Sequence, residues 1–114
     1  MKIPITIIAP KFLKTISLVI DIAAITLYPF IISREKMSED LLRHESIHIA
    51  QQKELFVVFF YILYGIDYLK GLIKFRDKKM AYFRIRFEQE AYAQMLNKHY
   101  LENRKPYSWR KYRV

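Results

Sequence analysis

Residues 38–54 read Ser-Glu-Asp-Leu-Leu-Arg-His-Glu-Ser-Ile-His-Ile-Ala-Gln-Gln-Lys-Glu, and this stretch decides the fold. Ser38 is a favourable N-cap, and the two acidic residues after it suit the positive end of a helix dipole. The stretch therefore predicts a helix that begins near residue 39. We expect this helix to continue through the aromatic residues 56–64, buried there in the core, with Gly65 as a C-terminal stop.

Two histidines and a glutamate lie within one turn of this helix, where residues 44–48 read His-Glu-Ser-Ile-His. Residues four apart share a helix face, so His44 and His48 can reach one zinc ion. Zinc lowers the pKa of a bound water towards about 7, and a carboxylate then takes its proton as the water attacks a carbonyl. The pattern predicts His44 and His48 as zinc ligands and Glu45 as the general base.

A third ligand is needed, because catalytic zinc usually takes three protein ligands and a water. The chain has no cysteine, and its third histidine is His99. Residues 87–93, Phe-Glu-Gln-Glu-Ala-Tyr-Ala, offer two carboxylates, Glu88 and Glu90, on a second predicted helix. His99 would lie about 16 Å along that helix from Glu88, which makes it a poor companion ligand. The residues alone leave Glu88 and Glu90 as the candidates.

Together, residues 41–54 and 86–94 resemble HExxH zincin metallopeptidases of the gluzincin group, in which the third-ligand helix reads E-x-x-A-D or E-x-x-A-N. The resemblance implies Glu88 as the third ligand, with Glu90 as the alternative. Tyr92 replaces the Asp or Asn of the group, so the carboxylate that would orient a ligating histidine is missing there. The pattern is also similar to that of small bacterial HExxH proteins that have no established substrate.

The resemblance implies a minimal zincin-like domain, which is α+β and predominantly helical, with the edge strand of a small sheet preceding the HExxH helix. Residues 24–32 are rich in β-branched and aromatic residues and predict that strand, and Pro29 places it at a sheet edge. In such peptidases a substrate strand pairs with this edge. Elsewhere we expect a short helix over 11–22 and a short helix with a loop over 66–80. A second long helix is expected over 79–103, before Pro106.

The length and composition of the chain limit the domain organisation, the kinds of site and the partners that can be expected. A chain of 114 residues has the size of one domain, and we place the domain at 1–103 and a basic aromatic tail at 104–114. The lack of cysteine excludes a disulfide scaffold, and two glycines leave no glycine-rich phosphate loop. The net charge of +9 comes from residues 69–114. An anionic membrane surface is therefore a candidate partner, whereas no nucleic-acid fold signature is present.

The sequence thus favours a zinc-dependent metallopeptidase that hydrolyses peptides or proteins. The alternative is a small basic membrane- or nucleic-acid-associated module with a structural or vestigial metal site. We expect a cytoplasmic or peripherally membrane-associated protein rather than an integral membrane protein, because the apolar runs are short or interrupted by Asp21 and Pro29. Gln51 and Gln52 follow the motif by one turn and could contact the metal ligands, but a surface position is the favoured expectation. The sequence gives no indication of the oligomeric state.

Overall fold

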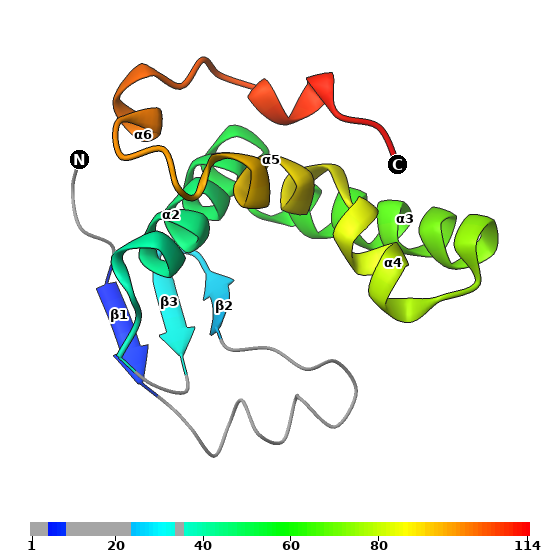
Figure 1. Ribbon diagram of the computed structural model, residues 1–114, viewed down its shortest axis with the longest axis horizontal. Helices are drawn as coiled ribbons and strands as arrows, with labels where there is room; N and C mark the ends of the chain where they lie inside the picture. Colours follow the sequence, from blue (N-terminus) through cyan, green and yellow to red (C-terminus); the bar gives the residue numbers. More distant parts are fainter. Residues whose placement is uncertain (1–4, 9–23, 34–35) are drawn as a thin grey trace.

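The computed structural model describes residues 5–8, 24–33 and 36–114, which form a small sheet followed by helices (Figure 1). The strands are β1 (Ile5–Ile8), β2 (Ala24–Leu27) and β3 (Phe30–Ser33). They form one sheet in the order β1-β3-β2, in which β1 and β3 are parallel and β2 and β3 antiparallel. The expected α+β, predominantly helical fold is confirmed, and the edge strand β2 precedes the motif helix.

The segment 24–32 is a hairpin, so the prediction of one continuous strand was wrong. Leu27 pairs with Phe30, and Tyr28 and Pro29 form the two-residue turn between β2 and β3. Proline lacks an amide donor, and the turn accommodates it at no cost to the ladder. Consequently β3, which directly precedes the motif helix, lies in the centre of the sheet, and β2 lies at its edge.

The motif helix is α2 (Glu39–Glu54), which begins as expected. The hydroxyl of Ser38 accepts a hydrogen bond from the amide of Leu41, and Glu39 and Asp40 occupy the first turn. The helix ends earlier than predicted, because Phe56 and Val57 have positive φ angles of 53° and 64°. This conformation is rare for a β-branched residue and stops the helix.

After this break the chain forms α3 (Val58–Phe75), with its axis bent by 113° from that of α2. The predicted stop at Gly65 was therefore wrong, since Gly65 lies inside α3, and so was the prediction of a short helix and loop over 66–80. The aromatic run 56–64 is not buried throughout, because Phe56 and Phe59 are exposed. In the part of the chain that the structure describes, no single helix combines the length and apolar character of a membrane span, although the bent pair α2 and α3 together meets those criteria.

The predicted long helix over 79–103 is also interrupted. It comprises α4 (Lys78–Arg84), α5 (Arg86–Gln94) and α6 (Tyr100–Asn103), and the 3-10 helix η1 (Ser108–Lys111) follows Pro106. Ile85 has an extended backbone and separates α4 from α5. The predicted helix over 11–22 lies outside the described residues.

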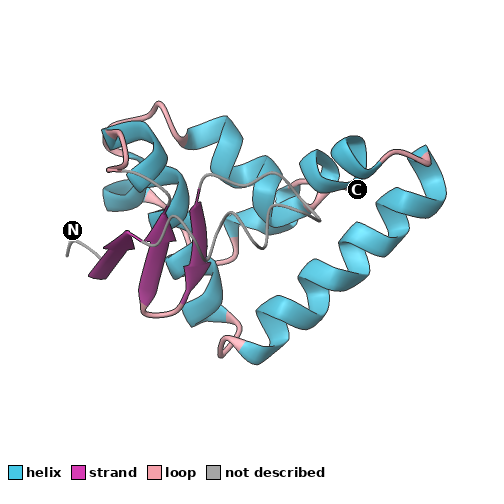
Figure 2. Ribbon diagram, turned by 90° about the horizontal axis from the view of Figure 1, so that it is seen from below, coloured by secondary structure: helices cyan, strands magenta, loops and turns pink. Residues whose placement is uncertain are grey.

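The aromatic core lies between α3, α5 and the C-terminal segment. Phe60, Ile85, Phe87 and Trp109 form one buried cluster, and the rings of Phe87 and Trp109 are 4.9 Å apart. Trp109 thus packs back on the domain, one of the arrangements open to a tail of aromatic and basic residues. Figures 1 and 2 show the C-terminal segment running along the helices on the side away from the sheet.

Two glycines of α3 give a matched pair of stability predictions. A Cβ at Gly71 would lie 2.8 Å from the Cα of Ala81 in α4, whereas a Cβ at Gly65 would meet nothing within 4 Å. We expect Gly71→Ala to destabilise the protein by about 1–3 kcal/mol, because backbone has to move. Gly65→Ala should stabilise it by about 1 kcal/mol through helix propensity. Urea unfolding of both variants measures the difference, and equal effects would contradict the close contact between α3 and α4.

Candidate metal centre

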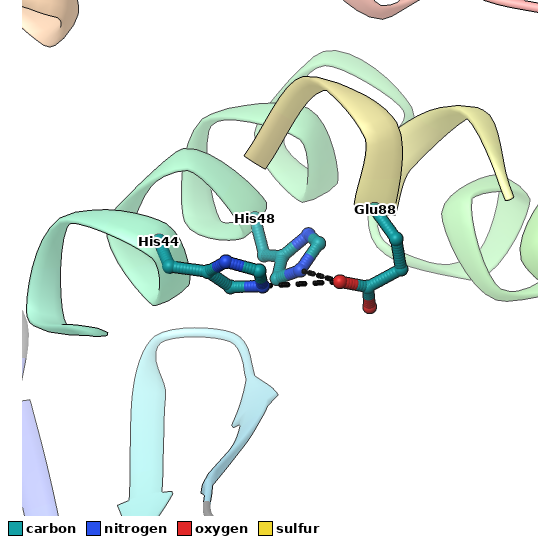
Figure 3. Close-up of side chains that lie close together, drawn as sticks. All are labelled: His44, His48 and Glu88. Carbon is teal, nitrogen blue, oxygen red and sulfur yellow. Dashed lines mark hydrogen bonds and ion pairs between the residues drawn. The ribbon is translucent and has the colours of Figure 1, made fainter. Parts of the chain in front are cut away.

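The two motif histidines lie one turn apart on the face of α2 that points into the molecule. His44 and His48 are both buried, and their ring centroids are 4.9 Å apart. Both imidazoles point towards Glu88 of α5 (Figure 3). The spacing of four residues on a helix therefore places both imidazoles at one location, as the sequence predicts.

Glu88 is positioned by the start of α5, which is held by α3. The buried carboxylate of Asp67 accepts a hydrogen bond from the backbone amide of Arg86 at 3.2 Å. It also accepts two from the Arg86 guanidinium, at 2.8 and 3.0 Å. An anionic cap at this end of a helix is favourable. The cap fixes the first turn of α5, and Glu88 belongs to that turn.

Three candidate ligand atoms converge on one point. Nε2 of His44 and Nε2 of His48 lie 3.0 and 3.1 Å from Oε1 of Glu88. Ligand atoms at about 2.0–2.1 Å from a tetrahedral zinc lie about 3.3 Å from one another, so small shifts would admit the ion. All three residues are buried, and their ligand atoms lie within 4.8 Å of one another.

The hydrogen bonds of Gln51 fix the tautomer of His48. The amide nitrogen of Gln51 donates to the carbonyl of Phe87 and to Oε1 of Glu90, both at 3.0 Å. Its oxygen therefore faces Nδ1 of His48, at 2.7 Å. An amide oxygen only accepts, so Nδ1 carries a hydrogen. In the neutral imidazole, Nε2 of His48 then carries no hydrogen, and its lone pair is directed at a carboxylate oxygen.

Two acceptors that face each other need a cation between them, either a proton or a metal ion. Burial lowers the pKa of His48, but the charge and hydrogen bond of Glu88 outweigh it and raise the pKa of His48 to about 9. Burial also opposes the ionisation of Glu88, yet the charge on His48 and the bonds to both imidazoles hold the pKa of Glu88 well below its ordinary value. A proton satisfies the group without metal, and the two imidazoles and carboxylate also form a donor set that fits zinc.

Tyr64 of α3 holds the other oxygen of Glu88. Its hydroxyl donates to Oε2 at 2.7 Å, which leaves Oε1 for the histidines. Burial and the charge of Glu88 raise the pKa of Tyr64 well above its ordinary value, so the hydroxyl remains a donor. Tyr64 therefore orients a candidate ligand, a role that its position in an aromatic run does not reveal.

Glu45, the predicted general base, is buried beside the three ligands and is not one of them. Its Oε2 accepts a hydrogen bond from the hydroxyl of Thr26 at 2.5 Å. Thr26 belongs to the edge strand β2, so the sheet orients this carboxylate. Oε1 accepts no hydrogen bond from any residue that the structure describes. One oxygen is thus fixed and the other is free to take a proton.

The alternative ligands lie elsewhere. Glu90 does not belong to the converging group and accepts hydrogen bonds from Arg104, Tyr100 and Gln51. Burial opposes its ionisation, but these three bonds hold the pKa of Glu90 below its ordinary value. His99 is exposed and lies near Glu102. Of the two carboxylates left open by the sequence, the structure brings Glu88 to the histidines.

Tyr92 contacts His44 through its ring. The ring centroids are 4.4 Å apart in an edge-to-face arrangement. Nδ1 of His44 is buried and has no hydrogen-bond partner among the described residues. On the Nδ1 side, packing against Tyr92 therefore takes the place of a hydrogen bond in orienting this imidazole, whose Nε2 contacts Glu88.

The expectation that Gln51 and Gln52 lie at the surface was wrong, since both are fully buried. Gln52 bonds to the edge strand β2, where it accepts from the amide of Tyr28 at 2.9 Å and donates to the carbonyl of Thr26 at 3.1 Å. Gln51 orients His48. For Gln51 the alternative that the sequence had left open, a contact with a metal ligand, is the one found, because a residue three or four positions after His48 shares the metal-facing side of the helix.

The same pair of glutamines gives a test of the His48 contact. Gln51→Met keeps the volume but removes the acceptor for Nδ1 of His48, and we expect zinc affinity to fall by about 10- to 100-fold. Gln52→Met removes an equally buried amide from the same helix without touching a histidine, so its zinc affinity should stay within about threefold of the wild type. Competition with a zinc-binding dye measures both variants, and equal losses would contradict the orienting role.

Comparisons with protein-family models, curated proteins and solved structures found no match to this chain.

Proposed function

We propose that the protein is a zinc-dependent metallopeptidase in which His44, His48 and Glu88 hold the metal and Glu45 is the general base. The observation that carries this proposal is the meeting of two imidazole nitrogens and one carboxylate oxygen at 3.0 and 3.1 Å. When His48 is neutral, its Nε2 has a lone pair directed at the carboxylate. The chain therefore forms a buried anionic group at which a divalent cation would replace a proton.

The residues around this group support hydrolysis rather than a purely structural site. When bound, zinc would supply an acidified water and polarise a substrate carbonyl. Glu45 offers one carboxylate oxygen for the proton of that water, while Thr26 holds the other. Tyr64 and Gln51 keep Glu88 and His48 in place through hydrogen bonds of 2.7 Å each. A structural site would not require a second, non-ligating carboxylate in the same buried region.

A peptide or protein substrate is proposed to bind along β2, the edge strand that carries Thr26. Two backbone groups on this edge already have hydrogen-bond partners within the protein. The carbonyl of Thr26 accepts from Gln52 and Tyr61, and the amide of Tyr28 donates to Gln52. Pairing of a substrate strand with these two backbone groups is therefore excluded. Any added strand would pair with the other end of β2, towards Ala24.

The metal content of the purified protein tests this proposal. We expect close to one zinc per chain in the wild type and trace amounts in His44→Ala and Glu88→Ala, because each variant removes one of three ligands. Glu102→Ala removes an exposed glutamate outside the centre and should retain zinc. Hydrolysis of a fluorogenic peptide library should disappear with a chelator and return with zinc. Equal zinc in the wild type and His44→Ala would contradict the proposed ligands.

A further inference from the structure

The outer face of α3 is apolar along its whole length. The side chains on this face are between 41% and 79% exposed, and they recur every three or four residues, so they form one stripe about 23 Å long. Figure 2 shows α3 as a long helix along one side of the molecule that begins beside the sheet and extends away from it. We call these residues the α3 stripe: Val58, Phe59, Ile62, Ile66, Leu69 and Ile73.

Three residues of α3 that are not apolar, Asp67, Tyr64 and Gly71, face the domain instead. Asp67 is fully buried and paired with Arg86, and Tyr64 donates to Glu88. Gly71 lies against Ala81 of α4. The inner face of α3 therefore packs on the domain through these residues and through Phe60 of the buried cluster, whereas the α3 stripe is a second apolar face that is left in water.

Positive charge gathers at the C-terminal half of the stripe. Lys70 and Lys74 flank it, and three further cations, Arg76, Lys78 and Lys79, follow within five residues. All five are exposed and none is paired with a described Asp or Glu side chain, while the ammonium of Lys74 donates to the backbone oxygen of Val114 at 3.4 Å. Asp67, the only acidic residue of α3, is buried, and nearby Asp77 caps α4. The solvent-exposed surface of α3 is thus apolar and cationic.

We propose that the α3 stripe docks on an anionic phospholipid bilayer, with α3 lying in the plane of the membrane surface. Apolar side chains would enter the region between headgroups, and lysine stems can lie along the apolar boundary while their ammonium groups contact phosphates. The charge complements this partner better than a second copy of the chain, which would present the same cations. Nucleic acid offers phosphates but nothing that would bury an aliphatic stripe.

Docking in this way leaves the candidate metal centre uncovered. Tyr64 and Phe60 contact that region from the opposite side of α3, where the ring of Phe60 lies 6.1 Å from that of His48. Membrane binding therefore needs no metal and no hydrolytic activity. It holds or fails independently of the proposed metallopeptidase function.

Vesicle flotation with the full chain tests the apolar part of the proposal. We expect the wild type to float with vesicles of phosphatidylcholine and phosphatidylglycerol at 7:3 and to remain unbound with pure phosphatidylcholine. Leu69→Gln/Ile73→Gln, at positions 59% and 79% exposed, should bind at least tenfold more weakly. The control Ile8→Gln/Leu96→Gln changes side chains that are 55% and 73% exposed elsewhere and should bind like the wild type.

A second pair of variants tests the charges. Lys70→Gln/Lys74→Gln should weaken binding to the anionic vesicles by about 25-fold, or about fivefold per lysine. Lys98→Gln/Lys105→Gln removes the same charge away from the stripe and should have little effect. Circular dichroism confirms that all variants fold.

The proposal is overturned if the wild type does not bind anionic vesicles or if the two lysine double variants weaken binding equally. A wild-type dimer that Leu69→Gln/Ile73→Gln converts to a monomer, without vesicle binding, would assign the stripe to a second copy instead.

Discussion

Glu45→Gln should retain the full zinc content and lower kcat for peptide hydrolysis by about 10²–10⁴-fold, the usual contribution of a general base. Glutamine keeps the size of the side chain and can still accept the hydrogen bond from Thr26. It cannot take a proton from water. The three proposed ligands do not include Glu45, so metal binding should survive. Elemental analysis and a fluorogenic peptide assay on the same preparation measure the two effects separately.

Glu39→Gln is the matched control, because it changes an exposed glutamate in the first turn of the same helix. It should keep both zinc and activity. If Glu45→Gln hydrolysed peptides as fast as the wild type, Glu45 would not be the base. If the wild type held zinc but cleaved no peptide in the library, a structural metal site would be the better interpretation.

The fold was predictable where local chemistry determines it and unpredictable where tertiary contacts do. Ser38 and the acidic residues after it specify the start of α2 through capping and the helix dipole. The end of α2 has no such signal, since Phe56 and Val57 adopt positive φ without a glycine or proline nearby. Here the amide of Val57 bonds to the carbonyl of Gln52, and the chain turns into α3. Gly65, the one conventional stop signal, is tolerated inside that helix.

In the candidate site, too, local sequence predicts some residues, whereas others depend on tertiary contacts. His44 and His48 could be paired from the sequence because their spacing matches one helical turn. Choosing Glu88 over Glu90 from residue type alone was impossible, since both are carboxylates two positions apart on one helix. The structure separates them through distant partners, Tyr64 for Glu88 and Arg104 for Glu90. Such contacts join residues remote in sequence, and only the resemblance to the gluzincin pattern pointed to Glu88.

Arg104→Met should destabilise the protein by about 3–5 kcal/mol, because it strands buried carboxylates without their cation. The Arg104 guanidinium donates to Glu90 at 2.6 and 3.1 Å and to Glu54 at 2.8 Å, which joins the C-terminal segment to α5 and α2. Its side chain is buried, and Glu90 is fully so. Lys105→Met, at the exposed neighbouring position, should change the free energy of unfolding by less than about 0.5 kcal/mol. Urea unfolding at pH 7 measures both variants.

The pH dependence distinguishes a stranded charge from lost packing. In the wild type Glu90 has a lowered pKa, so its contribution to stability is present above the ordinary carboxyl pKa and is lost as pH falls. In Arg104→Met, burial without the cation should raise the pKa of Glu90, and protonation then relieves the penalty. The stability difference between wild type and variant should therefore be largest at pH 7 and shrink towards pH 4. The double variant Arg104→Met/Glu90→Gln removes the stranded charge and should recover part of the lost stability at pH 7. If the loss of stability were independent of pH and Glu90→Gln did not reduce it, the role of Arg104 would be packing alone.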